Sequence, residues 1–222
     1  VEAERYSALG HMAAQLAHSI RNPITAIGGT ARLLARKIDN REWLQFLAMM
    51  SGEAEKIEKI LEDLFSFVEQ VKPVLEQTHL LPLVQKSLLL HAHTLKEQNI
   101  RQTLLLPEAD PLVEVDPRLI QQALVHLIRN SVEAMPGGGE LGIEVAVEGD
   151  VVRIILRDSG HGLDTSRKGN VTDPFYTTKM VGTGMGLTLV KRIIEDHGGT
   201  LRVDNRSVGG VRATVVLPRG RG

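Results

Sequence analysis

Residues 1–37 and 42–71 each carry an apolar stripe at helical spacing, and these two stripes limit the fold more than any other feature of the sequence. The first stripe contains Leu9, Met12, Leu16, Ile20, Ile24, Ile27, Leu34 and Ile38. The second contains Leu44, Leu47, Met50, Ala54, Ile57, Leu61, Leu64 and Val68. Most steps are three or four residues, so each stripe follows one side of a helix. Pro23 should bend the first helix, because it removes a backbone donor and crowds the preceding turn.

Only the short breaker Asp39-Asn40 separates the two stripes, so the sequence predicts an antiparallel helical hairpin. A two-helix hairpin cannot hide both of its stripes by itself. Two copies packed as a four-helix bundle can, and we therefore predict a homodimer through residues 1–72. The alternative is that the hairpin packs against the rest of its own chain.

The pattern changes after Lys72-Pro73, and residues 76–222 are expected to form a second domain. Helices are predicted at 81–98, 116–135 and 185–196, and strands at 102–106, near 113, and at 140–148, 151–157, 200–205 and 211–217. Asp116-Pro117 is a good N-cap followed by a first-turn proline. Gly149-Asp150 should turn a β-hairpin. This mixed order predicts an α+β sandwich, in which helices cover one face of a mixed sheet.

Composition excludes several classes of protein. The net charge of −1 gives no electrostatic footprint for nucleic acid. The absence of cysteine excludes disulfides and thiolate metal sites, and it suits a reducing cytoplasm. No apolar run approaches the length that crosses a bilayer. Because the chain starts at Val1 inside a helical pattern, we expect a fragment whose N-terminal neighbour has been removed, and such a fragment can be the cytoplasmic part of a membrane-bound sensor.

The segment from His18 to Pro23 is the first candidate for chemistry. If Leu16 and Ile20 face the core, His18 lies off that stripe, where a ring nitrogen can reach a phosphoryl donor. An unprotonated imidazole is a competent nucleophile near neutral pH. Asn22 lies one helical turn further on, so its amide shares a face with the imidazole.

Asn130 and His126 form a second pair one turn apart on a helix. The Asn130 carbonyl oxygen suits a hard cation such as Mg²⁺. An asparagine inside a helix is mildly unfavourable, since its side chain competes for backbone hydrogen bonds, so a compensating contact is expected. A buried asparagine bonded to a loop would explain the residue equally well.

Two glycine-containing segments follow. Asp158 ends a predicted strand, where it can accept a hydrogen bond from an exocyclic amine such as that of adenine. Gly182 and Gly184 precede a helix, whose free N–H groups can bind phosphates, and Lys179 can add a charge. The spacing fits neither a dinucleotide fingerprint nor a Walker A loop.

Taken together and in this order, the segments resemble the catalytic core of sensor histidine kinases, and the likeness covers essentially the whole chain. His18 through Pro23 resembles the H box, and Asn130 the N box. Asp158, Gly160 and Gly162 resemble the G1 box, Phe175 the F box, and Gly182, Gly184 and Gly186 the G2 box. The sequence Pro-Phe-Tyr-Thr-Thr-Lys, which begins at Pro174, is most similar to that of the nitrogen-regulator branch of these kinases.

The resemblance implies that Asp158 binds the adenine amino group and that Asn130 ligates Mg²⁺. Residues 160–186 would form the lid over ATP, with Arg129 and Lys179 contacting phosphates. Further nucleotide-binding positions on this basis are His126, Thr178, Thr183, Met185 and Leu187. His18 would attack the γ-phosphorus, and the phosphoryl group would pass to an aspartate of a response regulator.

Two positions depart from the family pattern. Ser19 stands where an acidic residue usually assists the nucleophile, which leaves open a scaffold that binds ATP and acts mainly as a response-regulator phosphatase through Asn22. His126 stands where these kinases commonly carry asparagine and related ATPases carry glutamate, so transfer to protein is favoured over a stand-alone ATPase. The other histidines, His197 among them, are expected to be surface or packing residues.

Overall fold

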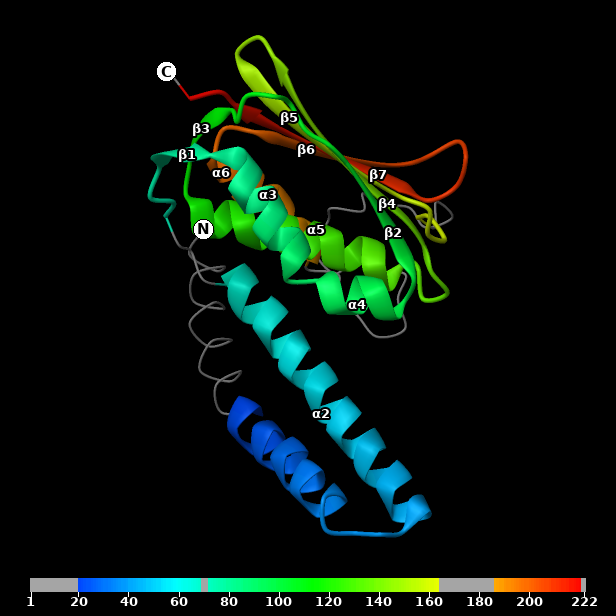
Figure 1. The fold of residues 1–222 in the computed structure, drawn as a ribbon. Coiled ribbons are helices and arrows are strands. Elements are labelled where there is room, and N and C mark those ends of the chain that lie inside the picture. The colour runs from blue at the N-terminus through cyan, green and yellow to red at the C-terminus, as the bar shows by residue number, and fades with distance from the viewer. Residues whose placement is uncertain (1–19, 69–71, 164–185, 221–222) are drawn as a thin grey trace. The chain divides into compact units, whose positions relative to one another are not determined.

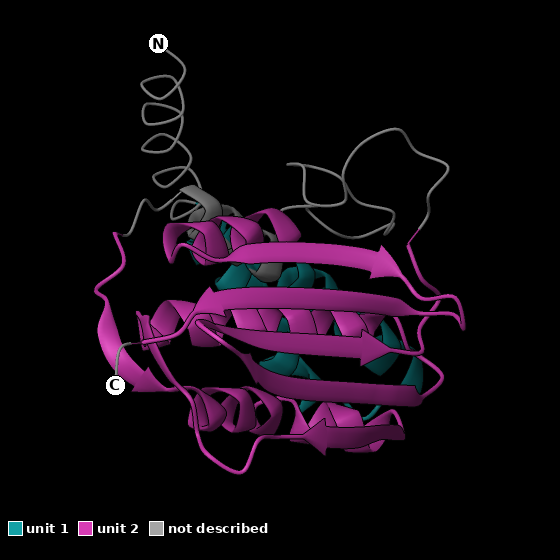
Figure 2. Ribbon diagram, turned by 90° about the horizontal axis from the view of Figure 1, so that it is seen from above, with its two compact units in different colours: residues 1–71, 179–185 teal, residues 72–178, 186–222 magenta. Residues whose placement is uncertain are grey.

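The computed structural model describes residues 20–68, 72–163 and 186–220. These residues divide into two compact units: the described residues up to 68 belong to the first, and those from 72 onward belong to the second (Figure 2). The calls on His18, Ser19 and positions 164–185 therefore lie outside the described residues. Each unit is considered by itself below.

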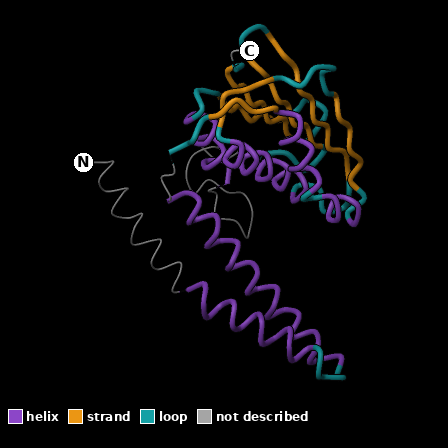
Figure 3. The backbone as a smooth tube through the Cα atoms, turned by 60° about the vertical axis from the view of Figure 1, so that its left-hand side comes forward, coloured by secondary structure: helices purple, strands orange, loops and turns teal. Residues whose placement is uncertain are grey.

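The first unit is the expected antiparallel helical hairpin (Figure 3). Residues 20–35 are helical, and α2 spans Arg41–Val68. Asn40 caps α2, because its Oδ1 accepts the N–H groups of Glu42 and Trp43 at 3.0 and 3.2 Å. The helices approach closely at Gly28, where an added Cβ would lie 3.0 Å from Ala54 Cβ. A small residue is therefore needed at this crossing.

The second unit contains a five-stranded mixed sheet in the order β2-β4-β5-β7-β6. Its strands are β2 (Ile100–Leu105), β4 (Gly139–Glu148), β5 (Val151–Asp158), β6 (Thr200–Asn205) and β7 (Val211–Pro218). β2 runs parallel to β4, and the other pairs are antiparallel. Glu148 pairs with Val151, so Gly149-Asp150 makes the predicted two-residue turn. The combination of one parallel pair with antiparallel pairs confirms the predicted mixed sheet.

Helices cover one face of this sheet, as the sequence predicts (Figure 1). They are α3 (Leu80–Leu89), α4 (Ala92–Glu97), α5 (Pro117–Glu133) and α6 (Gly186–Asp196). Alternate residues of β5, namely Val152, Ile154 and Leu156, are fully buried and join the core beneath the helices. The sandwich thus has one continuous apolar layer that carries both α5 and α6.

Three elements differ from the prediction. The single helix expected at 81–98 is divided into α3 and α4. α3 ends with a C-cap at Leu90, and the side chains of Leu89 and Leu90 at the break are exposed. The strand expected at 102–106 begins two residues earlier, at Ile100. An unpredicted strand, β1 (Glu76–His79), pairs with β3 (Leu112–Val115) in a separate two-stranded sheet. The polar and largely exposed β1 has no apolar alternation to reveal it.

Candidate functional site

The polar side of α5 brings three of the predicted residues together. His126 is 7% exposed, and its Nδ1 lies 2.8 Å from Nη2 of Arg129. A guanidinium group can only donate, so Nδ1 accepts and the neutral imidazole carries its proton on Nε2. Arg129 also lies 4.0 Å from Glu133, one turn further on. Asn130 is half-buried on the same helix.

Gly186, the first residue of α6, lies against this polar side of α5. A Cβ added to Gly186 would lie 3.7 Å from His126 Nδ1 and 4.0 Å from both Arg129 Nη2 and Asn130 Nδ2. The beginning of α6 therefore lies within van der Waals reach of the Arg129 and Asn130 side chains. A helix N-terminus beside a guanidinium group favours negative charge, so this corner suits phosphate groups.

Asp158 is held at the end of β5 and is 4% exposed. Its Oδ1 accepts the N–H groups of Gly160 and Val211, each at 3.0 Å. Its Oδ2 accepts the Ser131 hydroxyl of α5 at 3.2 Å, which ties the carboxylate to the helix that carries Asn130. These contacts fix the orientation of the carboxylate, and its Oδ2 retains acceptor capacity for a further donor.

The two glycines after Asp158 are needed for different reasons. A Cβ at Gly160 would lie 2.6 Å from Ala134 Cβ and 2.7 Å from Ala134 O, so the backbone passes too close to the end of α5 for any side chain. Gly162 has φ +79°, a conformation that L residues rarely adopt. Together they let the chain turn sharply next to Asp158.

Residues at the turn between β6 and β7 hold the backbone of Asp158 and of the segment that follows it. The sequence analysis did not identify this contribution. Arg206 Nη1 donates to Asp158 O at 2.5 Å. Asn205 Oδ1 accepts from Leu163 N at 2.6 Å, and Asn205 Nδ2 donates to Leu163 O at 2.9 Å. Gly210 is so close that a Cβ would lie 2.0 Å from Asp158 O. In the sequence this segment looks like an ordinary polar turn, so only spatial proximity reveals its role.

The remaining predicted positions divide into two groups. Asn22 is exposed in the hairpin unit, and Leu187 is half-buried in α6. Outside the described residues lie His18, Ser19, Phe175, Thr178, Lys179, Gly182, Thr183, Gly184 and Met185. Within residues 20–68, 72–163 and 186–220, no group of three or more histidine or acidic side chains is placed to hold a metal ion. Over the same ranges, no helix combines the length and apolarity that a membrane span requires.

The fold and the site define a class: a helical hairpin with a second, ATP-binding type of domain. Residues 115–221 match the family described as "Histidine kinase-, DNA gyrase B-, and HSP90-like ATPase". Residues 8–70 match the "His Kinase A (phospho-acceptor) domain". The chain belongs to the sensor histidine kinases, of which it comprises the catalytic core.

Similar proteins agree with this assignment. Sensor histidine kinase ZraS of Escherichia coli (strain K12) is 32% identical over 97% of this chain and 46% of its own length. Sporulation kinase E of Bacillus subtilis (strain 168) is 29% identical over 95% of this chain and 28% of its own length. The chain thus spans less than half the length of these relatives.

Two solved structures share the fold across both units. Histidine kinase ThkA in complex with response regulator TrrA gives a TM-score of 0.72 at 29% identity, covering 98% of this chain and 64% of that one. Full-length ShkA in complex with AMPPNP gives a TM-score of 0.76 at 22% identity, covering 96% of this chain and 46% of that one. The second likeness concerns the fold alone.

Proposed function

We propose that this chain binds Mg-ATP in its second unit and transfers the γ-phosphoryl group to His18 of the hairpin. The observation that carries the proposal is the meeting of the α6 N-terminus with His126, Arg129 and Asn130, on the same helix whose Ser131 orients Asp158. This arrangement offers an acceptor for an adenine amine and donors for phosphates. The family matches over 8–70 and 115–221 support the same assignment.

Each described side chain has a role in this proposal. Asp158 Oδ2 accepts the adenine amino group, while Gly160 and Gly162 let the backbone lie against the ring. Arg129 and the N–H groups at the start of α6 bind the phosphates. His126 accepts from Arg129 at Nδ1 and so holds the guanidinium group beside the start of α6. Lys179 and the glycines from Gly182 complete the phosphate contacts, as the family pattern implies.

The half-buried amide of Asn130 fits a magnesium ion that accompanies ATP, since its carbonyl oxygen is a hard ligand beside the phosphate corner. When bound, such an ion offsets charge on the phosphates. The chain supplies the nucleophile: a ring nitrogen of His18 forms the new N–P bond while the bond from the γ-phosphorus to the bridging oxygen breaks, and ADP leaves. The imidazole proton passes to solvent or to a nearby base.

The assembly and the partner follow from the same assignment. We propose domain limits of 1–72 and 76–222, a homodimer formed through the hairpin, and transfer of the phosphoryl group to an aspartate of a response regulator. The complex of the similar kinase ThkA with response regulator TrrA supports such a partner. The relatives are named kinases, which favours phosphoryl transfer over the phosphatase scaffold.

Incubation with γ-labelled ATP tests the proposal. We expect label on the protein that is stable in alkali, lost in acid and absent from the His18→Gln variant. His11→Gln, in the same segment, is the matched control and should retain the label. Release of free phosphate without labelled protein would instead identify an ATPase.

A further inference from the structure

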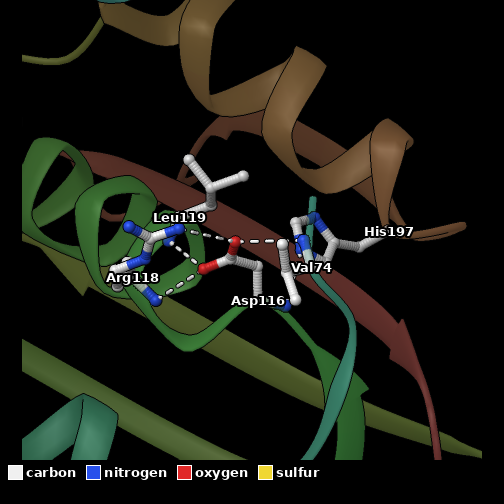
Figure 4. Close-up of polar contacts among 5 residues, drawn as sticks. All are labelled: Val74, Asp116, Arg118, Leu119 and His197. Carbon is white, nitrogen blue, oxygen red and sulfur yellow. Dashed lines mark hydrogen bonds and ion pairs between the residues drawn. The ribbon is translucent and has the colours of Figure 1, made fainter. Parts of the chain in front are cut away.

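A buried polar junction lies at the far end of α5 from Asn130, outside the site described above (Figure 4). Its centre is Asp116, the residue before α5, which is 1% exposed. Asp116 Oδ1 accepts the N–H groups of Arg118 and Leu119 at 3.0 and 3.3 Å, which is ordinary helix capping. Asp116 Oδ2 accepts the N–H group of Val74 at 3.1 Å, 42 residues earlier in the chain. A helix cap does not require this second contact.

His197 joins the same junction from the end of α6. It is 5% exposed, and its Nε2 lies 3.0 Å from the backbone N of Asp116. Because the backbone N–H can only donate, Nε2 accepts, and the ring proton is on Nδ1. Nδ1 then donates to Ile193 O at 2.6 Å, in the last turn of α6. The neutral ring thus connects the end of α6 to the beginning of α5.

The charge of Asp116 is maintained in this setting. Burial raises the pKa of its carboxyl, but the N–H groups of Val74, Leu119 and Arg118 and the charge of Arg118 outweigh that effect, and the pKa lies below its ordinary value. Arg118 Nη2 is 3.5 Å from Oδ2. The carboxylate is therefore ionised at neutral pH and holds Val74 through a charge-assisted hydrogen bond.

The junction thus joins the segment that enters the second unit to both helices of the nucleotide site. Val74 follows closely on position 71, the last position of the N-terminal stretch that belongs to the first unit. α5 carries Asn130, and α6 begins at Gly186, beside Asn130. Asp116 holds Val74 at the beginning of α5, and His197 ties Asp116 to the end of α6, so a displacement of the segment at Val74 acts on both helices.

We propose that Asp116 and His197 are positioning residues, which hold the connecting segment in register with α5 and α6 so that the terminal phosphoryl group of ATP is delivered to His18. The proposal rests on the function proposed above. It predicts that releasing Val74 leaves nucleotide binding intact and slows the transfer, since small misplacements of reacting groups cost rate steeply.

Two variants of the full chain release Val74 while sparing the cap. Val74→Pro removes the only donor that residue 74 offers, and its exposed side chain has no role in the junction. Asp116→Asn keeps an Oδ1 that can cap α5, but the amide that replaces Oδ2 cannot accept from Val74. Val74→Ala retains the N–H group and is the matched control. His197→Gln, which can still offer an acceptor to Asp116 N, should be milder than His197→Ala.

Two measurements are made on each variant: ATP affinity by equilibrium dialysis, and the rate of His18 labelling at saturating ATP. We expect Val74→Pro and Asp116→Asn to bind ATP within about twofold of the parent and to label about tenfold or more slowly. Val74→Ala should match the parent in both. Parent-like labelling by Val74→Pro would overturn the proposal, and so would an equal loss of affinity and rate, which would indicate a purely structural cap.

Amide hydrogen exchange distinguishes failure of this inference from failure of the proposed kinase activity. If the parent binds ATP but His18 takes no label, the kinase proposal fails. The junction is then judged by exchange in peptides covering residues 72–79 and 186–197. Asp116→Asn should accelerate exchange in the first peptide and His197→Ala in the second, and unchanged exchange would overturn the junction whatever the activity.

Discussion

The two units of this protein bury their apolar residues to very different extents. In the described part of the hairpin, the buried apolar residues are Ala31, Leu47, Ala54 and Leu61, two of which are small. Large apolar side chains remain exposed there: Ile20, Ile27, Leu33, Leu34, Trp43, Phe46, Met49 and Met50. The second unit encloses a continuous core that includes Leu80, Leu95, Ile120, Ile154 and Leu217, each at most 1% exposed.

The difference shows that the two units depend on different sources of stability. Full burial of one large apolar side chain contributes about 1.5–3 kcal/mol, so the second unit is stabilised by its own sequence. The hairpin forgoes much of that contribution as a single chain and can recover it only by covering its exposed face. We therefore expect the hairpin to depend on protein concentration and the second unit to be independent of it.

A charge on the exposed face of the hairpin should produce the largest effect. Met50→Glu would place a carboxylate in the proposed dimer interface, where burying an unpaired charge costs several kcal/mol. We expect light scattering to report a monomer, while ATP affinity is unchanged. Gln45→Glu adds the same charge to an exposed polar position five residues away and should remain dimeric. A dimeric Met50→Glu protein would mean that the hairpin covers its stripe in another way.

A substitution in the candidate nucleotide site should affect only the second unit. Asp158→Asn weakens a buried acceptor, and a hydrogen bond to a charged group is worth about 1.5–3 kcal/mol, so ATP affinity should fall roughly 10- to 100-fold. The molecular mass should stay that of the dimer. Asp150→Asn, in the exposed β4–β5 turn, is the control and should bind ATP normally. Unchanged ATP affinity in Asp158→Asn would show that the adenine site has been misplaced.

Ser19→Glu should alter chemistry in the hairpin without altering the nucleotide site. General-base assistance contributes about 10²–10⁴-fold, and a hydroxyl carries no charge with which to provide it, so we expect the labelling rate to rise at least tenfold. ATP affinity should be unchanged. Ser7→Glu controls for added charge in the same segment. An equal or lower rate in Ser19→Glu would refute a base at this position.

Lowering the pH should reduce the unfolding free energy of the second unit by protonating Asp116. This is the smallest of the predicted effects. Its pKa is lowered on folding, so its ionised form stabilises the protein above the ordinary value of 3.8, and that contribution is lost as the pH falls through the lower pKa of the folded state. The difference in unfolding free energy between the parent and Asp116→Asn should therefore narrow below about pH 3.8. Denaturant titrations between about pH 6 and pH 3 measure it; a constant difference would argue against the ionised carboxylate.

Local signals predicted the elements whose formation depends on neighbouring residues. The hairpin turn at Gly149-Asp150 and the cap at Asp116-Pro117 lie where turn and capping chemistry place them. Local signals failed where such chemistry is absent. The break at Leu90-His91 contains neither proline nor glycine, and β1 forms because β3 offers it a partner 33 or more residues away.

Sequence reasoning proposed the residues of the candidate site but not the contacts among them. His126, Asn130 and Asp158 were identified by type and order, since the chemistry of phosphate and adenine recognition needs those groups. Arg129 sets the tautomer of His126, and Ser131 helps to orient the carboxylate of Asp158. The support from Asn205 and Arg206 was missed, because a polar turn carries no signal of what it will contact.

The sequence by itself determined the helical periodicity of the hairpin, the mixed order of the second unit and the set of groups proposed to bind a nucleotide, because each depends on residue type and spacing along the chain. Tertiary structure alone decided which carboxylate oxygen meets which donor, why Gly160 and Gly210 must be small, and how His197 connects α6 to Asp116. These contacts join residues that are tens of positions apart. They arise only when the apolar layer between sheet and helices has closed, since that packing fixes where each polar group lies.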